Sequence, residues 1–125
     1  MKTTKKDFEI FKAEVRRFMD VFELNNWEVA FEHKELKNNN ATITPQLGNY
    51  KAVITLSTDN DYDKVTSDYS FTEYIKRNAL HEVIHLLLSR MSVVGQSRYI
   101  SNAEQEEAEE ELVIKLMHIF NKRDI

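Results

Sequence analysis

Apolar residues near the beginning of the chain recur every three or four positions, which is the spacing of one face of a helix. The residues at this spacing are Phe8, Phe11, Val15, Phe18, Met19 and Phe22. Thr4 stands where a helix cap is needed, and the pair Asn25 and Asn26 supplies a stop signal. We therefore expect an amphipathic helix between these points, with its apolar face turned towards a core.

From residue 27 the period changes to two, and the side chains alternate between two faces over residues 27–34. This alternation is typical of a strand that is buried on one side. Two further strands are predicted at residues 41–44 and 50–57, joined by a turn that contains Pro45 and Gly48. The simplest arrangement is a three-stranded meander, which makes the sheet mainly antiparallel.

Two capping boxes predict the last two helices, because each places a serine three residues before a glutamate, Ser70 before Glu73 and Ser101 before Glu104. The first of these helices is apolar on most sides, which predicts burial. Its apolar residues are Ile75, Leu80, Val83, Ile84, Leu86, Leu87 and Leu88. Those of the second are Ala108, Leu112, Val113, Leu116, Met117, Ile119 and Phe120. With a short connection at residues 93–100, the order is helix, three strands, helix, helix, which is an α+β fold.

The composition indicates one compact domain over residues 1–125. Of the 125 residues, 42% are hydrophobic and 30% charged, with two glycines and one proline, and we find no repeat or linker. The net charge of −4 comes from 17 basic and 21 acidic residues, so neither nucleic acid nor a membrane is expected as a partner. No apolar run has the length of a signal peptide or a membrane span, and we expect a cytoplasmic protein. Nothing in the sequence specifies the oligomeric state.

Histidines provide the candidate chemistry, because the sequence has no cysteine and a transition metal could be held only by His, Asp and Glu. His81 and His85 are four residues apart in the predicted buried helix, so their imidazoles lie on one face, one turn apart. That is the arrangement of a two-histidine zinc site. Glu82 would lie beside the ion, where its carboxylate can accept a proton from water that zinc has acidified.

The same three residues could instead form a polar network in a core that holds no metal. Two histidines and a glutamate in a strongly apolar stretch cost free energy unless they have partners. A zinc ion is the partner that their spacing suits, so we expect Zn²⁺.

Alternating aspartates in residues 58–68 resemble the beginning of a calcium-binding loop. Counted from Asp59, the positions that require Gly and Glu hold Lys64 and Ser70. We therefore expect a solvated loop there.

The pattern His81, Glu82, x, x, His85 resembles the HExxH motif of the zincin metallopeptidases. The order of elements resembles the minimal zincins of small phage and prophage proteins, which have an N-terminal helix, a short sheet, the motif helix and one further helix. The resemblance implies a zinc-dependent metallopeptidase that hydrolyses a peptide or protein substrate, with Glu82 as general base. In zincins the peptide commonly lies along an edge strand, and residues 50–57 are the expected strand here.

The third metal ligand distinguishes the subgroups of zincins. Metzincins and the zinc endoribonucleases of ribosomal RNA maturation use a third histidine on an extended motif, but Met91 stands six places after His85 and the next histidine is His118. What remains is the gluzincin pattern, in which a glutamate of the following helix completes the site. The candidates are Glu104, Glu106, Glu107, Glu109, Glu110 and Glu111.

We predict Glu110 as the third ligand, with Glu109 and then Glu106 as alternatives. The gluzincin pattern resembles a glutamate followed by apolar residues at +3, +6, +7 and +10, which Glu110 satisfies, whereas Glu109 lies nearer the middle of the apolar face. Val113 and Ile114 replace the polar residues that many gluzincins place after the glutamate, so polar groups that would orient the ligands are missing on that side.

Other roles are less well specified. Tyr99, His118 and Tyr74 are the candidate donors to a developing oxyanion, although none has a distinctive spacing. His33 is expected to be an ordinary half-buried histidine rather than a ligand. Two alternative functions stay open: a zinc-binding interaction module with weak or no activity, and a zinc hydrolase that acts on a substrate other than a peptide.

Overall fold

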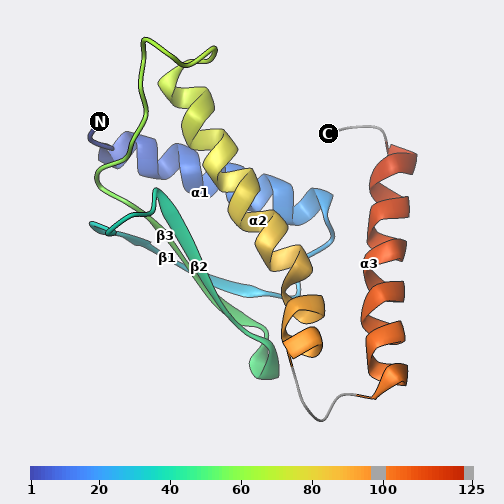
Figure 1. The fold of residues 1–125 in the computed structure, drawn as a ribbon. Coiled ribbons are helices and arrows are strands. Elements are labelled where there is room, and N and C mark those ends of the chain that lie inside the picture. The colour runs from blue at the N-terminus through green and yellow to red at the C-terminus, as the bar shows by residue number, and fades with distance from the viewer. Residues whose placement is uncertain (97–100, 123–125) are drawn as a thin grey trace.

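The computed structural model describes residues 1–96 and 101–122 of the chain. Its elements are α1 (Lys5–Val21), β1 (Glu28–His33), β2 (Ala41–Gln46), the short 3₁₀ helix η1 (Leu47–Asn49), β3 (Lys51–Leu56), α2 (Phe71–Gln96) and α3 (Asn102–Lys122). Figure 1 shows these elements in order. The expected α+β class and the order helix, three strands, helix, helix are confirmed.

The sheet is mixed, and its strand order is β1-β3-β2. β1 pairs with β3 in parallel, and β2 pairs with β3 antiparallel. The expected meander is therefore wrong, because β3 lies in the centre and β2 at an edge. The reason lies in the side chains: Ala52, Ile54 and Leu56 of β3 are buried, whereas Pro45, which cannot donate a main-chain hydrogen bond, lies in β2 and suits an edge strand.

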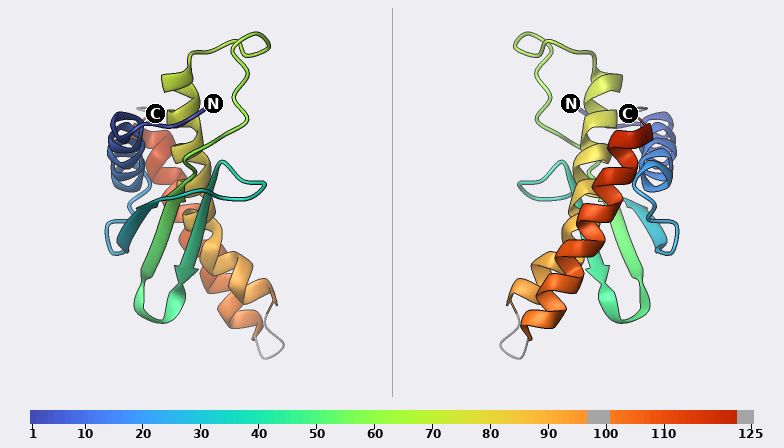
Figure 2. Two further views of the ribbon diagram at one scale, coloured as in Figure 1. Left: turned by 90° about the vertical axis from the view of Figure 1, so that its left-hand side faces the viewer. Right: turned by 90° about the vertical axis from the view of Figure 1, so that its right-hand side faces the viewer.

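One face of the sheet meets the helices, and the other faces solvent. Along β1 the burial alternates, with Glu28, Ala30 and Glu32 exposed, as the period of two predicts. The buried core joins α1, β3 and α2 in one cluster. Its fully buried apolar members are Phe11, Val15, Ile54, Leu56, Ile75, Ala79 and Val83. Figure 1 shows α2 crossing α1 and passing beside β2, and Figure 2 shows the same arrangement from two sides.

All three helices begin at the capping residues that the sequence predicts. The Thr4 hydroxyl accepts from Asp7 N, and the Asp7 carboxylate accepts from Thr4 N, which completes a capping box at α1. The Ser70 hydroxyl accepts from Glu73 N and the Ser101 hydroxyl from Glu104 N, both at 3.1 Å. These bonds satisfy main-chain donors that the first turn of a helix leaves free.

α2 is longer than expected and runs to Gln96, so half of the expected connection at residues 93–100 belongs to it. α3 then lies antiparallel to α2 (Figure 1), and the two helices contact each other. Among the described residues of α3, Ala108 is buried, while Val113, Ile114 and Leu116 are 40%, 45% and 38% exposed. The predicted apolar face of α3 is thus only partly covered. No helix in the described ranges is long and apolar enough to cross a membrane.

Candidate metal centre

The residues of the HExxH motif lie in the middle of α2. Glu82 is buried, with 4% of its surface exposed, whereas both histidines are exposed. The rings of His81 and His85 are adjacent, with centroids 4.7 Å apart and planes nearly perpendicular, at 89°. α2 therefore presents two imidazoles at the surface with a carboxylate beneath them, as the helical spacing predicted.

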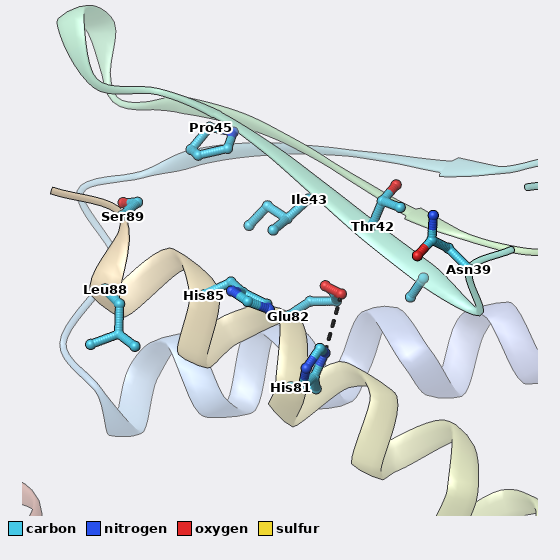
Figure 3. Close-up of a pocket in the computed structure, with 10 residues that line it drawn as sticks. Asn39, Thr42, Ile43, Pro45, His81, Glu82, His85, Leu88 and Ser89 are labelled. Carbon is cyan, nitrogen blue, oxygen red and sulfur yellow. Dashed lines mark ion pairs between the residues drawn. The ribbon is translucent and has the colours of Figure 1, made fainter. Parts of the chain in front are cut away.

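Glu82 has one oxygen in contact with a histidine and one without a partner. Its Oε1 lies 3.4 Å from His81 Nδ1, and its Oε2 is buried with no hydrogen-bond partner. Figure 3 shows Glu82 pointing from α2 towards β2, with Ile43 across the cleft. Because a buried carboxylate oxygen is costly to leave unpaired, this oxygen is suited to a proton donor that comes from outside the chain.

A cleft of about 470 Å³ lies over the motif, between α2 and the edge strand β2. From α2 its lining includes both histidines and Glu82, together with Leu88 and Ser89 (Figure 3). The Ser89 hydroxyl donates to Leu86 O at 2.7 Å and is therefore already engaged. The cleft thus combines apolar walls with the motif's titratable groups, which is typical of a binding site.

The other wall of the cleft is the edge of the sheet. The bond from Ser57 N to Asn40 O, at 2.9 Å, fixes the phase of the β2–β3 ladder. Because bonded and non-bonded pairs alternate in such a ladder, the main-chain groups of Ala41, Ile43 and Pro45 point away from β3. The side chains of the same three residues line the cleft.

The edge strand over the motif is therefore β2, and the expectation that residues 50–57 would serve is wrong. β3 is paired on both sides and has no free edge. Pro45, expected in a turn, lies within β2 instead, and this extends β2 along the cleft. A signal was present, since a proline that follows alternating residues is compatible with an edge strand.

The structure does not place Glu110 beside the histidines. Glu110 is exposed and lines a different hollow, which is also formed by Glu107, Ile114 and Lys115. Lys115 Nζ donates to Glu23 O at 2.6 Å, which ties α3 to the turn after α1. Among the residues whose side chains the structure describes, no three His, Asp or Glu are arranged to hold a metal ion. Glu110 as third ligand therefore stays a prediction, as do Glu109 and Glu106.

The residues present fit part of a zinc site. Two imidazoles on one face of a helix, next to a buried carboxylate with an unpaired oxygen, match the donors and the base that such a site needs. His81 Nδ1 already faces Glu82, a contact that resembles the carboxylate–histidine pairs that orient metal ligands.

Tyr74 is one of the candidate oxyanion donors, and its hydroxyl is engaged elsewhere. It donates to Asp61 Oδ1 at 2.5 Å and accepts from Asn40 Nδ2 at 2.6 Å. Burial, together with the hydrogen bond to Asp61, raises the pKa of Tyr74 well above its usual value. Tyr99 and the side chain of His118 lie outside what the structure describes.

His33 has a structural role, as expected. The Thr3 hydroxyl donates to Ser57 O at 2.7 Å, so it accepts from His33 Nε2, also at 2.7 Å. The ring of Phe8 stacks on the imidazole, with centroids 4.8 Å apart. His33 thus joins the N-terminal segment to the sheet.

No protein-family model matches the chain, and no curated protein matches it in sequence. Among solved structures, the chain is similar to the metallopeptidase zymogen jannalysin of Methanocaldococcus jannaschii. The two are 23% identical, the match covers 93% of this chain and 96% of that chain, and the TM-score is 0.41. A likeness at this TM-score is too loose to assign a family or an activity to this chain.

Proposed function

We propose that this protein is a zinc-dependent metallopeptidase. The observation that carries the proposal is the buried Glu82, whose Oε2 lacks a partner, beside two exposed imidazoles whose rings are 4.7 Å apart at a cleft. A structural carboxylate in a core is normally hydrogen-bonded on both oxygens. Glu82 instead lines the cleft and has an oxygen with no partner, which leaves that oxygen free to accept a proton from a bound molecule.

His81 and His85 are the proposed zinc ligands from α2, and Glu110 is the proposed ligand from α3. Zinc, when bound, supplies Lewis-acid activation of water and of the scissile carbonyl. Glu82 accepts a proton from the attacking water and then delivers that proton to the leaving amine nitrogen. A peptide bound between the apolar walls of the cleft would exclude bulk water and so strengthen the electrostatic interactions within it.

β2 is the proposed docking strand for the substrate. The outward N–H and C=O groups of Ala41 and Ile43 are available to an extended peptide, which would pair with the edge as an added strand. Such pairing recognises main chain, so the side chains in the cleft would confer selectivity. A peptide or protein substrate is therefore proposed.

The direct test combines metal content with peptide hydrolysis for the wild type, Glu82→Gln and His81→Ala. We expect one zinc per chain and hydrolysis in the wild type, zinc without hydrolysis in Glu82→Gln, and neither in His81→Ala. Unchanged hydrolysis in Glu82→Gln would count against the proposed mechanism. Stoichiometric zinc without hydrolysis of any peptide by the wild type would favour a zinc-binding interaction module instead.

A further inference from the structure

A second cleft, of about 350 Å³, continues from the first towards the beginning of α2. The two clefts share Asn39, Ala41, His81 and Glu82 in their linings. We call this second space the Arg77 cleft, because it is further lined by Arg77, Tyr69 and the amides of Asn38 and Asn78. A molecule that occupies the first cleft can therefore extend directly into the Arg77 cleft.

The Arg77 side chain is held in place and still has capacity to bind. Its guanidinium lies over the ring of Tyr69, 4.1 Å from the centroid, and stacking of this kind leaves the N–H groups free for acceptors in the plane. Its Nε is 3.9 Å from Glu73 Oε1, and both side chains are more than half exposed, which makes a weak ion pair. In the described part of the chain, no other carboxylate lies within ion-pair distance of Arg77.

The other polar groups of the Arg77 cleft are mainly neutral amides, which can donate to a carboxylate. Asn38 and Asn39 are exposed amides, and Asn78 Nδ2 is buried near the Tyr74 hydroxyl without a well-formed hydrogen bond. Among its described lining residues, Glu82 is the only carboxylate, and it is 4% exposed. Asp61 is near, but its carboxylate already accepts from Tyr74 and Asn40, and it lines a neighbouring hollow instead.

The position of the Arg77 cleft indicates which part of a ligand would enter it. Ala41, at the beginning of β2, lines both clefts, whereas Pro45, near its end, lines only the first, with Leu88 and Ser89. A peptide that pairs along β2 and passes over His81 and His85 would thus leave the first cleft at its Ala41 end. The peptide residues beyond that point would meet Arg77 and the asparagine amides of the Arg77 cleft.

We propose that the Arg77 cleft is a specificity subsite that binds a carboxylate of the peptide substrate. The carboxylate can come from an aspartate or glutamate side chain or from the C-terminus of the peptide, since both present the same planar acceptor to a guanidinium. This subsite rests on the proposed peptidase function, and its role is selectivity for the substrate rather than chemistry.

The first experiment measures hydrolysis of quenched fluorescent peptide libraries by the zinc-loaded protein. One library set fixes Asp, Glu, Asn or Gln at each position in peptides with an amidated C-terminus, and a second set compares free with amidated C-termini in peptides without acidic residues. We expect one set to show a carboxylate preference of about five- to tenfold in kcat/KM. Arg77→Gln should abolish that preference and leave kcat/KM for the neutral peptides within about twofold.

Arg17→Gln is the matched control. Arg17 also stacks on an aromatic ring, Phe18 at 4.3 Å, and pairs with a glutamate one turn away, Glu14 at 2.7 Å, but it lies on α1 and lines neither cleft. The Arg17→Gln protein should therefore keep the carboxylate preference of the wild type. The preference of the wild type should also weaken in high salt, because Arg77 is solvent-exposed.

A second experiment separates the subsite from the proposed function. Acidic and neutral versions of the same labelled peptides are bound to zinc-loaded Glu82→Gln protein, with and without Arg77→Gln, and affinity is measured by fluorescence anisotropy. Tighter binding of the acidic peptide that depends on Arg77 supports the subsite even if the wild type cleaves nothing. Cleavage with no carboxylate preference, or a preference that survives Arg77→Gln, overturns the subsite and leaves the peptidase intact.

Discussion

Replacement of Glu82 by glutamine tests whether this residue is present for chemistry or for the fold. Glu82 is 4% exposed, its Oε2 has no partner, and its Oε1 reaches His81 Nδ1 only at 3.4 Å. A buried polar group without a partner costs about 1–3 kcal/mol, and a charged one costs more. Glutamine has nearly the same volume and no charge, so Glu82→Gln should raise the free energy of unfolding of the metal-free protein by about 1 kcal/mol.

Thermal unfolding in the presence of a chelator resolves this difference, because 1 kcal/mol shifts the midpoint by about 3–6 °C in a domain of this size. With zinc restored, peptide hydrolysis should fall by about 10²–10⁴. Glu73→Gln is the matched control on the same helix, because Glu73 is 51% exposed. The free energy of unfolding of the Glu73→Gln protein should stay within about 0.5 kcal/mol of the wild type.

A metal-free Glu82→Gln protein that is less stable than the wild type by 1 kcal/mol or more would refute this reasoning. Glu82 would then be a satisfied member of the core, and its burial would have no functional meaning. The test therefore separates the proposed general base from a metal-free polar network.

Four further outcomes are expected. Glu110→Gln should lower zinc affinity about 10–100-fold, measured by competition with a chromogenic chelator; unchanged affinity would remove Glu110 from the ligand set. Ala41→Pro deletes an outward N–H, so it should raise KM about fivefold and leave the fold intact. Thr42→Pro deletes a hydrogen bond of the β2–β3 ladder, so it should lower the free energy of unfolding, measured in urea, by about 2 kcal/mol or more. Equal effects of the two prolines would argue against docking at the edge. Tyr74→Phe should lower the free energy of unfolding by about 1–3 kcal/mol, because it removes a hydroxyl that bonds Asp61 and Asn40. Hydrogen bonds from Tyr74 and Asn40 hold the pKa of Asp61 below its ordinary value of 3.8, so the stability advantage of the wild type over Asp61→Asn should be present at neutral pH and shrink as the pH falls below 3.8. An advantage that stays constant at low pH would contradict this assignment.

The elements that local patterns specify were predictable. The spacing of Phe11, Val15 and Phe18 is enough to define the buried face of α1, and Thr4 and Ser70 cap helices because a hydroxyl before a first turn has main-chain donors to satisfy. The proximity of His81, Glu82 and His85 follows from helical geometry alone. These features depend only on residues within a few positions of one another.

The sheet order and the cleft depend on contacts between distant segments. A period of two indicates that residues 41–46 and 51–56 are strands, but not which of them takes the centre; that choice depends on which strand packs most of its side chains against α1 and α2. The pairing of β2 at the edge in turn decides that Ala41 and Ile43 face the motif. The Arg77 cleft likewise brings together α2 and the loops before β2 and α2.

The third metal ligand is the part of the proposed site that local sequence patterns do not specify. By itself, the sequence determined the α+β order, the helix caps and the placement of two imidazoles beside a carboxylate, because each follows from the fixed geometry of one element. Only the tertiary structure decided that β2 is the open edge above the motif and that Glu110 lines a hollow with Glu23, in the turn after α1. The orientation of one helix against another is set by the packing of whole faces, and a periodic pattern does not contain that information.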